Sequence, residues 1–399
     1  MLKVKIMSNR VVIKFGGADL ATGEKVSQAA QMVADANYKE KIVVVSAMGK
    51  TTDSLLYMTS QIGDVSDADY AELISMGERV SARFFCSALR ALGAKAELFD
   101  PCKDNWPLIT DSKFRNAIPD MKKTTERTKK FLAPLLATAI PVVCGFIGKD
   151  HYGRITSLGR GGSDTTALVL AKCLDADEVI LVKETSGVLS ADPKIVSVAR
   201  SLDKLDVHEM FDLAQGGAKI VKPEALLYKQ PNQVLRVVDF SSGNLSVGGT
   251  EITGSLDIDS SYVLSHQDLI AVNVVCEVNA ENLSRVFSAL SQKPIYGVSS
   301  GSRSITLFTS DGDIAEVIRK LHDVPNFKAV SHRENVAMLQ VRHPTFIESP
   351  GAVAALSTAL SQQGINIIEV TTSKATINVF IEENQIKRAK EAIGNVFKS

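Results

Sequence analysis

The chain has 399 residues, which is enough for two or three domains, each with a core of its own. Hydrophobic residues make up 45% and charged residues 23%, the balance of an ordinary soluble globular protein. The 45 basic and 45 acidic residues cancel, so no net positive charge would draw the chain to nucleic acid or to an anionic membrane.

Cysteine usage and the amino-terminal residues indicate a cytoplasmic protein. The five cysteines are scattered without a CxxC pair, which predicts free thiols and no intrinsic metal site. Lys3, Lys5 and Arg10 leave no room for the apolar core of a signal peptide. Residues 131–148 carry no charge, but Pro134 and Pro141 interrupt them. We therefore expect a helix end, a turn at Pro141 and a buried strand there, and no membrane span.

The first part of the chain alternates short β-branched runs with longer amphipathic segments. Strands are predicted at 11–15, 41–46, 96–99, 141–144 and 178–182, with helices between them that include 72–92 and 164–174. Apolar strands separated by helices are typical of a mainly parallel sheet that is covered on both faces. In such a sheet, ligands bind beyond the carboxyl ends of the strands.

The last third of the chain contains an internal repeat. Ala-Leu-Ser-Gln at 289–292 recurs at 359–362, and Ser-Ile-Thr-Leu-Phe at 304–308 matches Thr-Ile-Asn-Val-Phe at 376–380. Each copy predicts a strand, a helix, two strands and a helix, which is too little for a large core. We expect two small α/β modules that pack against each other or against a partner.

Two polar segments follow the first predicted strands. Lys14 precedes a pair of glycines, whose backbone N–H groups could approach a phosphate while the lysine adds a positive charge. Gly49-Lys50-Thr51 lacks the first glycine of a P-loop, because Val44 stands at that position. Hydroxyl donors at the strand end, or a simple helix N-cap, remain as interpretations of the second segment.

The strongest signal is the segment 156–167 (TSLGRGGSDTTA), which leads into a predicted helix. A helix N-terminus attracts anions, and Arg160 can bind a carboxylate through two hydrogen bonds. A capped loop with Ser163 or Asp164 as N-cap explains only one of these residues. Elsewhere, spacing alone favours a surface position for Glu78. Glu126 interrupts the basic run 122–130, which predicts a solvated helix face rather than a nucleic-acid patch.

In their order along the chain, these segments resemble the aspartate kinases of the amino-acid kinase superfamily. The matching segments are 14–17, 43–55, 75–93, 145–167, 190–196 and 217–221, together with 349–351 and 364–367 of a regulatory ACT module. The resemblance implies a three-layer αβα kinase domain with a mainly parallel sheet, followed by two ferredoxin-like βαββαβ (ACT) modules. The implied ranges are 1–235 for the kinase domain, 236–262 for a linker, and 263–332 and 333–399 for the ACT modules.

The resemblance also implies a reaction. The γ-phosphoryl group of ATP would pass to the side-chain carboxylate of L-aspartate, giving 4-phospho-L-aspartate for lysine, threonine and methionine biosynthesis. Mg²⁺ would arrive with ATP, and the carboxylate, ionised near pH 7, would need no general base. The ACT pair implies a homodimer or dimer of dimers, with possible allosteric lysine or threonine.

The family roles carry over residue by residue. Lys14 and Lys219 would bind the phosphates from opposite sides, and Asp164 would hold both lysines by charge pairing. The further ATP-binding residues implied are Phe15, Gly16, Gly17, Lys183, Glu184, Asp192, Pro193 and Lys194. The residues implied for aspartate are Ser46, Thr52, Glu78, Arg160, Gly161, Gly162 and Ser163, with Arg160 on a carboxylate and Glu78 on the ammonium group.

Three positions depart from the family pattern. Ala18-Asp19 stands where a hydroxyl residue is usual, Lys183-Glu184 replaces a Thr-Asp pair, and 278–282 lacks the Pro-Gly of the second ACT copy. Two alternatives stay open: a kinase for another acidic amino acid such as glutamate, and a catalytically silent amino-acid sensor. The segments around Glu78 and Arg160 disfavour the first. The presence of Lys14, Asp164 and Lys219 disfavours the second.

Overall fold

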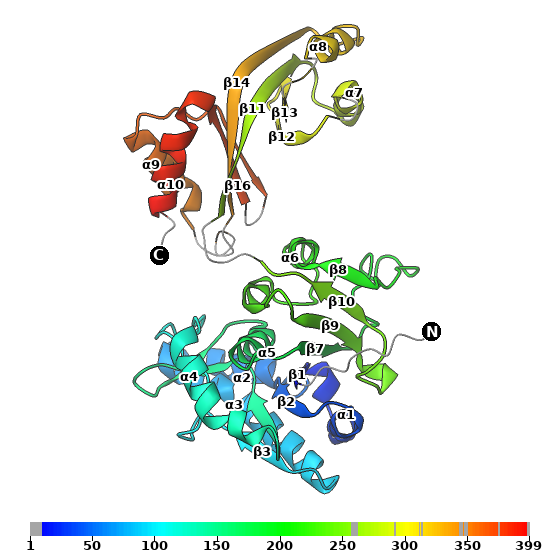
Figure 1. Cartoon of the computed structure of the whole chain (residues 1–399), viewed down its shortest axis with the longest axis vertical. Coiled ribbons are helices and arrows are strands. Elements are labelled where there is room, and N and C mark those ends of the chain that lie inside the picture. The colour runs from blue at the N-terminus through cyan, green and yellow to red at the C-terminus, as the bar shows by residue number, and fades with distance from the viewer. Residues whose placement is uncertain are drawn as a thin grey trace. The chain divides into compact units, whose positions relative to one another are not determined.

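The computed structural model describes residues 10–256, 262–290, 293–310, 312, 314–342, 346, 350–373 and 376–396. The chain divides into two compact units, Met1–Leu256 and Asp257–Ser399, which are described separately below. Figure 1 shows a helix-covered sheet in each of them.

The first unit is built on an eight-stranded sheet in the order β3-β4-β2-β1-β7-β9-β10-β8. Neighbouring strands are parallel except β9 and β10, so the predicted mainly parallel sheet is confirmed. The strands are β1 (Arg10–Phe15), β2 (Glu40–Val45), β3 (Ala96–Phe99), β4 (Ile140–Cys144), β7 (Glu178–Lys183), β8 (Lys204–Asp206), β9 (Val234–Asp239) and β10 (Thr250–Thr253). A separate hairpin joins β5 (Ile147–Lys149) to β6 (Ile155–Ser157).

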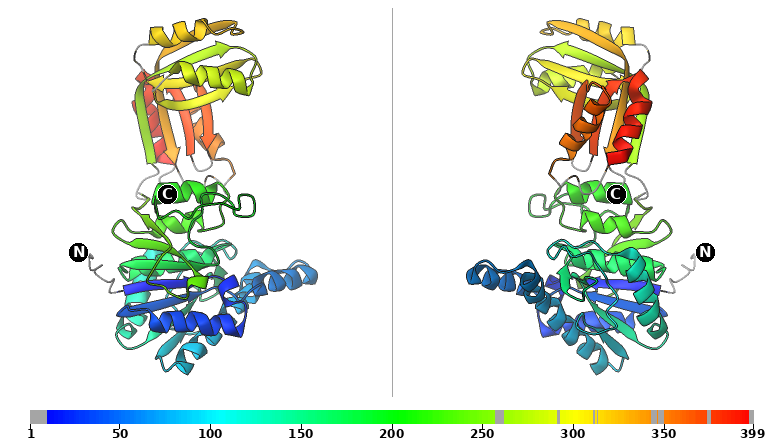
Figure 2. Two further views of the ribbon diagram at one scale, coloured as in Figure 1. Left: turned by 90° about the vertical axis from the view of Figure 1, so that its right-hand side faces the viewer. Right: turned by 90° about the vertical axis from the view of Figure 1, so that its left-hand side faces the viewer.

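Helices cover both faces of this sheet. They are α1 (Gly23–Asp35), α2 (Thr51–Ile62), α3 (Asp67–Ala91), α4 (Met121–Phe131), α5 (Gly162–Cys173) and α6 (Val207–Gln215), with 3-10 turns η1 (Ala18–Leu20), η2 (Ala133–Leu135), η3 (Pro223–Tyr228) and η4 (Phe240–Ser242). Val11, Val12 and Ile13 are consecutive and fully buried, because side chains on both faces of β1 meet a helical layer. Figure 2 shows α2 projecting from the unit, and Thr59 is the one buried side chain of that helix.

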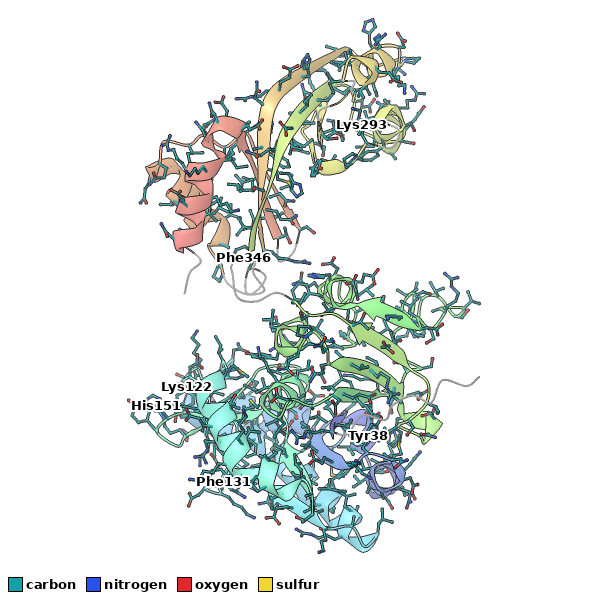
Figure 3. The ribbon with its side chains drawn as sticks, in the orientation of Figure 1. Tyr38, Lys122, Phe131, His151, Lys293 and Phe346 are labelled. Carbon is teal, nitrogen blue, oxygen red and sulfur yellow. The ribbon has the colours of Figure 1, made fainter. Side chains whose placement is uncertain are left out.

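The structure tests two predictions about the segments on either side of residue 131, the basic run 122–130 and the uncharged stretch 131–148. The basic run lies on α4, where Lys122 is exposed, as Figure 3 shows, and the predicted solvated face is confirmed. The uncharged stretch after Phe131 forms η2 and β4. Pro141 lies inside β4 rather than at a turn. No helix in the described ranges is long and apolar enough to cross a membrane.

The amino ends of the strands are tied together by a buried polar cluster. Glu178 at the start of β7 forms an ion pair with Arg236 on β9. The Tyr38 hydroxyl, labelled in Figure 3, donates to Glu178 Oε2 at 3.1 Å and accepts from Arg236 Nη2 at 3.2 Å. Burial and the Glu178 charge raise the pKa of Tyr38 to about 12, so its hydroxyl stays protonated.

At the opposite edge, the carboxyl ends of the strands come together. Phe15 of β1 pairs with Val45 of β2 on one side and with Val182 of β7 on the other. Val45 in turn pairs with Cys144 of β4. The turns that follow these four strands therefore lie beside one another, which is where the polar segments of the sequence were expected to meet.

The segment expected to be a linker, 236–262, differs in the structure. Residues 236–256 complete β9, form η4 and provide β10, whose Ile252 is buried against Leu235 of β9. The Gly-rich stretch that suggested a linker is the loop between these two antiparallel strands. Residues 257–261 lie outside the described ranges.

The second unit contains one six-stranded sheet in the order β12-β13-β11-β14-β16-β15. Its strands are β11 (Tyr262–Val275), β12 (Ile295–Ser300), β13 (Ser304–Ser310), β14 (Ala329–Arg342), β15 (Glu369–Ser373) and β16 (Thr376–Glu382). Its helices are α7 (Ala280–Leu290), α8 (Ile314–His322), α9 (Ala352–Gln362) and α10 (Ile386–Val396), with a 3-10 turn η6 (Glu383–Gln385).

The two predicted modules share their central strands. The carboxyl half of β11 pairs with β13, whereas its amino half, from Tyr262 to His266, pairs with Met338 to Arg342 of β14. That half of β14 also pairs with β16, so the amino half of β11 supplies the last strand of the second βαββαβ module. The expected boundary between residues 332 and 333 falls inside β14.

Each module has its own apolar core beneath its own helix pair, α7 with α8 and α9 with α10. Figure 1 shows the two pairs on opposite sides of the unit. A third cluster joins the modules, and in it Phe308 and Phe380 stack with ring centroids 3.6 Å apart. The internal repeat therefore folds as one intertwined body.

Candidate active site

The site begins with a buried charge cluster at the carboxyl ends of β1 and β7. Nζ of Lys14, on β1, lies 2.8 Å from Oδ1 of Asp164, in the first turn of α5. Nζ of Lys183, the last residue of β7, lies 3.5 Å from Oδ2 of the same carboxylate. The Lys222 backbone N–H also hydrogen-bonds to Asp164. One carboxylate thus orients two lysines from neighbouring strands.

The charges of this cluster follow from its contacts. Burial alone would raise the pKa of Asp164, but Lys14 and Lys183 outweigh burial and lower it to about 2. Burial lowers the pKa of Lys183 to about 8, although Asp164 opposes that shift. Near pH 7, Asp164 is therefore ionised and Lys183 is mainly protonated.

A second carboxylate, Asp19, lies at the same strand ends. Its Oδ2 accepts the backbone N–H of Gly16 at 2.9 Å, within the Gly-Gly turn after β1. Only 1% of Asp19 is exposed, and its Oδ1 has no hydrogen-bond partner. Burial raises the pKa of Asp19 to about 6, against the lowering effects of the Gly16 N–H, Lys14 and Lys183.

Glu78 is buried in α3, so the surface position that spacing alone favoured is wrong. Its Oε1 accepts the Ala47 N–H at 3.2 Å, in the turn after β2, and its Oε2 has no hydrogen-bond partner. Burial raises the pKa of Glu78 to about 7. Gly77 allows this approach, because a Cβ there would lie 2.8 Å from the Cβ of Ala47.

Glycines also shape the start of α5. A Cβ at Gly145, in the turn after β4, would lie 2.6 Å from Oγ of Ser163. Gly161 caps the helix in a left-handed conformation (φ +73°), and a Cβ there would lie 2.8 Å from Cβ of Lys222. The first turn of α5, including Gly162 and Ser163, is thereby held against the strand ends.

The other residues implied for aspartate lie around this turn. Arg160 is exposed at the residue before the Gly161 cap. Ser46 and Thr52 are half-buried on either side of the turn between β2 and α2, which donates its Ala47 N–H to Glu78.

The residues implied for ATP are spread more widely. Phe15 is buried at the end of β1, and Glu184 pairs with Lys25 at 2.8 Å. Asp192, Pro193 and Lys194 form an exposed turn in which Asp192 Oδ1 accepts the Lys194 N–H at 2.9 Å.

One predicted pairing differs from the structure. The second lysine beside Asp164 is Lys183, whereas Lys219 is exposed in the segment after α6. The reason is the parallel pairing of β1 and β7, which brings the end of β7 next to Lys14. The role of Lys219 on the phosphates stays a prediction. The contact of Asp19 with Gly16 and the position of Lys222 were not foreseen.

Comparisons with known proteins show the family of the chain. The amino acid kinase family model matches residues 9–239, and an ACT domain model matches residues 331–394. The aspartokinase of Corynebacterium glutamicum is 31% identical, over 97% of this chain and 96% of its own length. The chain belongs to the amino acid kinase family, among its aspartokinases. The predicted resemblance and the predicted enzyme, an aspartate kinase, are thereby confirmed.

Solved structures of aspartokinases share the fold. Aspartate kinase from Synechocystis aligns with a TM-score of 0.79 at 24% identity, over 97% of this chain and 69% of that one. E. coli aspartokinase III, in complex with aspartate and ADP, aligns with a TM-score of 0.57 at 22% identity, over 97% of this chain and 99% of that one. The complex of the same enzyme with lysine and aspartate aligns with a TM-score of 0.55 at 22% identity, over 98% of this chain and 100% of that one. The αβα kinase domain followed by ACT-type modules is therefore the fold of this aspartokinase.

Proposed function

We propose that this aspartokinase transfers the γ-phosphoryl group of ATP to the side-chain carboxylate of L-aspartate, giving 4-phospho-L-aspartate. The observation that carries the proposal is the buried carboxylate of Asp164 between Lys14 and Lys183 at the strand ends. The relatives named aspartokinase, and the aspartate and ADP complex of E. coli aspartokinase III, support both substrates.

The geometry suits phosphoryl transfer between two anions. Such transfer needs positioning and neutralised charge more than covalent chemistry by the protein. Lys14 and Lys183 would contact the phosphates from the strand ends, and Lys219 would contact them from the segment after α6. Asp164 keeps the first two ammonium groups in place. The ADP-side contacts would come from the turn at Asp192 to Lys194 and from Glu184.

Aspartate would bind between α3 and the start of α5. The Arg160 guanidinium, exposed beside the Gly161 cap, would bind one carboxylate, with Gly162 and Ser163 at the helix N-terminus. The Glu78 Oε2 atom, buried without a hydrogen-bond partner, would accept a hydrogen bond from the ammonium group of aspartate. The attacking carboxylate is already ionised near pH 7, so the chain has no proton to remove.

Mg²⁺ would come with the nucleotide. The two carboxylates at the site, Asp19 and Asp164, already contact lysines and an amide, which fits a cation held mainly by phosphate oxygens and water. In the described part of the chain, no three His, Cys, Asp or Glu residues gather as a metal site. When bound, Mg²⁺ would neutralise part of the triphosphate charge.

Regulation would reside in the second unit. The lysine complex of E. coli aspartokinase III supports lysine as an effector of this chain, with threonine as the alternative. Two copies would pair through their ACT modules, as a homodimer or dimer of dimers in the cytoplasm. The product would enter lysine, threonine and methionine synthesis.

Trapping of the acyl phosphate tests the proposal. The full chain is incubated with ATP, Mg²⁺, hydroxylamine and either L-aspartate, L-glutamate or N-acetylglutamate, and ADP and hydroxamate are measured. We expect hydroxamate with aspartate only, and less of it when lysine or threonine is added. Turnover with another acid would show a sister kinase. Silence with every acid would contradict the proposal and leave an amino-acid sensor as the better account.

A further inference from the structure

We propose that the Asp19 carboxylate occupies the position beside the Gly16 N–H that a nucleotide phosphate would take, and that the nucleotide must displace it. Lys183 is the cation that this carboxylate shares with the phosphates. Asp19 is thus a positioning residue that weakens nucleotide binding while it is charged. The inference rests on the proposed function only in taking the ligand to be a polyphosphate.

The contacts of Asp19 are those that a phosphate oxygen would make. Its Oδ2 takes the Gly16 N–H at 2.9 Å, the donor expected to bind a phosphate. A Cβ built on Gly16 would lie 3.1 Å from that oxygen and 3.9 Å from Lys14 Nζ, so both groups crowd the same turn. The Gly16 N–H is therefore already used by an internal anion.

Lys183 completes this arrangement from β7. The pairing of Phe15 with Val182 places Lys183 beside the Gly-Gly turn, and η1, which carries Asp19, packs against β7. The charges of Lys183 and Asp19 act on each other's pKa, and Lys183 also pairs with Asp164 at 3.5 Å. Lys14 and Lys183 thus face two carboxylates, Asp19 and Asp164, at these strand ends.

The ionised Asp19 carboxylate is held only weakly in its buried position. Its Oδ1 is buried without a partner, which is costly for an ionised oxygen. The charged groups that face it are Lys14 from β1 and Lys183 and Glu184 from the end of β7. Its pKa, raised to about 6, means that the carboxylate is ionised above pH 6 and neutral below. Competition with phosphate should therefore weaken as the pH falls through 6.

Asp19 and Lys183 carry opposite charges at the same strand ends, and each charge shifts the pKa of the other group. Substitutions at the two positions are therefore expected to be coupled, so that removing both charges does less harm than removing the lysine alone.

Binding of inorganic tripolyphosphate and of ADP to the full chain, by titration calorimetry without Mg²⁺, tests this inference. The variants are Asp19→Asn, which can keep the Gly16 hydrogen bond without the charge, Lys183→Gln, and the double variant. At pH 7.5 we expect Asp19→Asn to bind about tenfold tighter than wild type and Lys183→Gln about tenfold weaker. The double variant should lie between them.

The pH dependence separates Asp19 from the phosphate's own titration. At pH 5.5 the wild type and Asp19→Asn should bind nearly equally. Most of Asp19 is then protonated, so it carries no charge, like the asparagine of the variant. Equal or weaker binding by Asp19→Asn at pH 7.5 would overturn the inference. Weaker binding confined to solutions with Mg²⁺ would show a metal ligand instead, and would overturn it as well.

These measurements need no aspartate and no turnover. If the variants bind as expected but no hydroxamate forms with aspartate, the proposed function fails and the inference stands. If the wild type forms hydroxamate but Asp19→Asn binds no tighter, the inference alone fails. Should Asp19→Asn not fold, Asp19→Ser, which also removes the charge, takes its place, and binding by Asp19→Ser at pH 7.5 that is no tighter than wild type contradicts the inference.

Discussion

Lys14 and Asp164 form an ion pair of 2.8 Å, with only 6% and 5% of their side chains exposed. Asp164→Asn leaves Lys14 and Lys183 facing each other without the carboxylate that pairs with both, and with only Asp19 nearby as a counter-charge. We expect the free energy of unfolding to fall by about 3–5 kcal/mol and kcat by at least about 100-fold. Denaturant unfolding and ADP release would measure both. The exposed Asp203→Asn is the matched control, and a kcat within twofold of wild type for Asp164→Asn would contradict the role given to this pair.

Gly145→Ala should disturb the start of α5. Its new Cβ would lie 2.6 Å from Ser163 Oγ and 2.9 Å from the Val45 carbonyl oxygen. We expect a loss of about 1–3 kcal/mol in the free energy of unfolding and a raised KM for aspartate. Gly23→Ala, in the first turn of α1 with nothing within 4 Å, is the control and should be neutral or stabilising. Equal effects of the two substitutions would show that the α5 turn is not tightly packed.

Glu78 predicts a pH dependence of aspartate binding. Its pKa, raised by burial to about 7, leaves it neutral in acid and charged above pH 7. The KM for aspartate should therefore fall as the pH rises from 6 to 8, because only the ionised form attracts the ammonium group. Initial rates in Glu78→Gln should show a higher KM without this change. A KM that stays constant in the wild type would place the ammonium group elsewhere.

The same group predicts a pH dependence of stability. The native state holds a proton on Glu78 up to about pH 7, whereas the unfolded chain releases it near its ordinary pKa of 4.5. Stability is therefore lost as the pH rises from 4.5 through 7. Glu78→Gln should match the wild type at pH 4 and exceed it by up to about 3 kcal/mol at pH 8. Urea unfolding at both pH values measures this, and a variant less stable at pH 8 would contradict the burial of the charge.

In the second unit, Gly297→Ala should separate the two modules. Its Cβ would lie 2.6 Å from Cζ of Phe380, which stacks on Phe308. We expect faster amide hydrogen exchange in β12, β13 and β16, and a loss of about 1–3 kcal/mol. Gly394→Ala in α10, with nothing within 4 Å, should stabilise its helix by about 0.5–1 kcal/mol. Unchanged exchange in Gly297→Ala would show that the stacked rings do not join the modules.

The sheet of the first unit could be predicted because its signal is local. Apolar runs that follow one another with helices between them place strands such as β1 and β7 within a residue of their observed ends. The shared strands of the second unit could not be predicted. The repeat shows two modules, but the pairing of the amino half of β11 with β14 joins residues that are far apart in the chain.

Part of the site was predictable for the same reason. Lys14 and Asp164 stand at the ends of recognisable elements. The burial of Glu78 could not be predicted from the order of polar and apolar residues. On α3, Leu73 and Met76 are exposed apolar side chains, whereas the Glu78 carboxylate is buried. The pairing of Lys183, rather than Lys219, with Asp164 depends on the β1–β7 register, which no motif encodes.

Identification of the hydroxamate tests the central claim most directly. The full chain would react with ATP, Mg²⁺, hydroxylamine and L-aspartate, and the product would be compared by mass spectrometry and chromatography with the two aspartate hydroxamates. We predict the 4-hydroxamate, in equal amount to the ADP released, and its loss in Asp164→Asn. The 1-hydroxamate, or ADP without any hydroxamate, would contradict phosphorylation of the side-chain carboxylate.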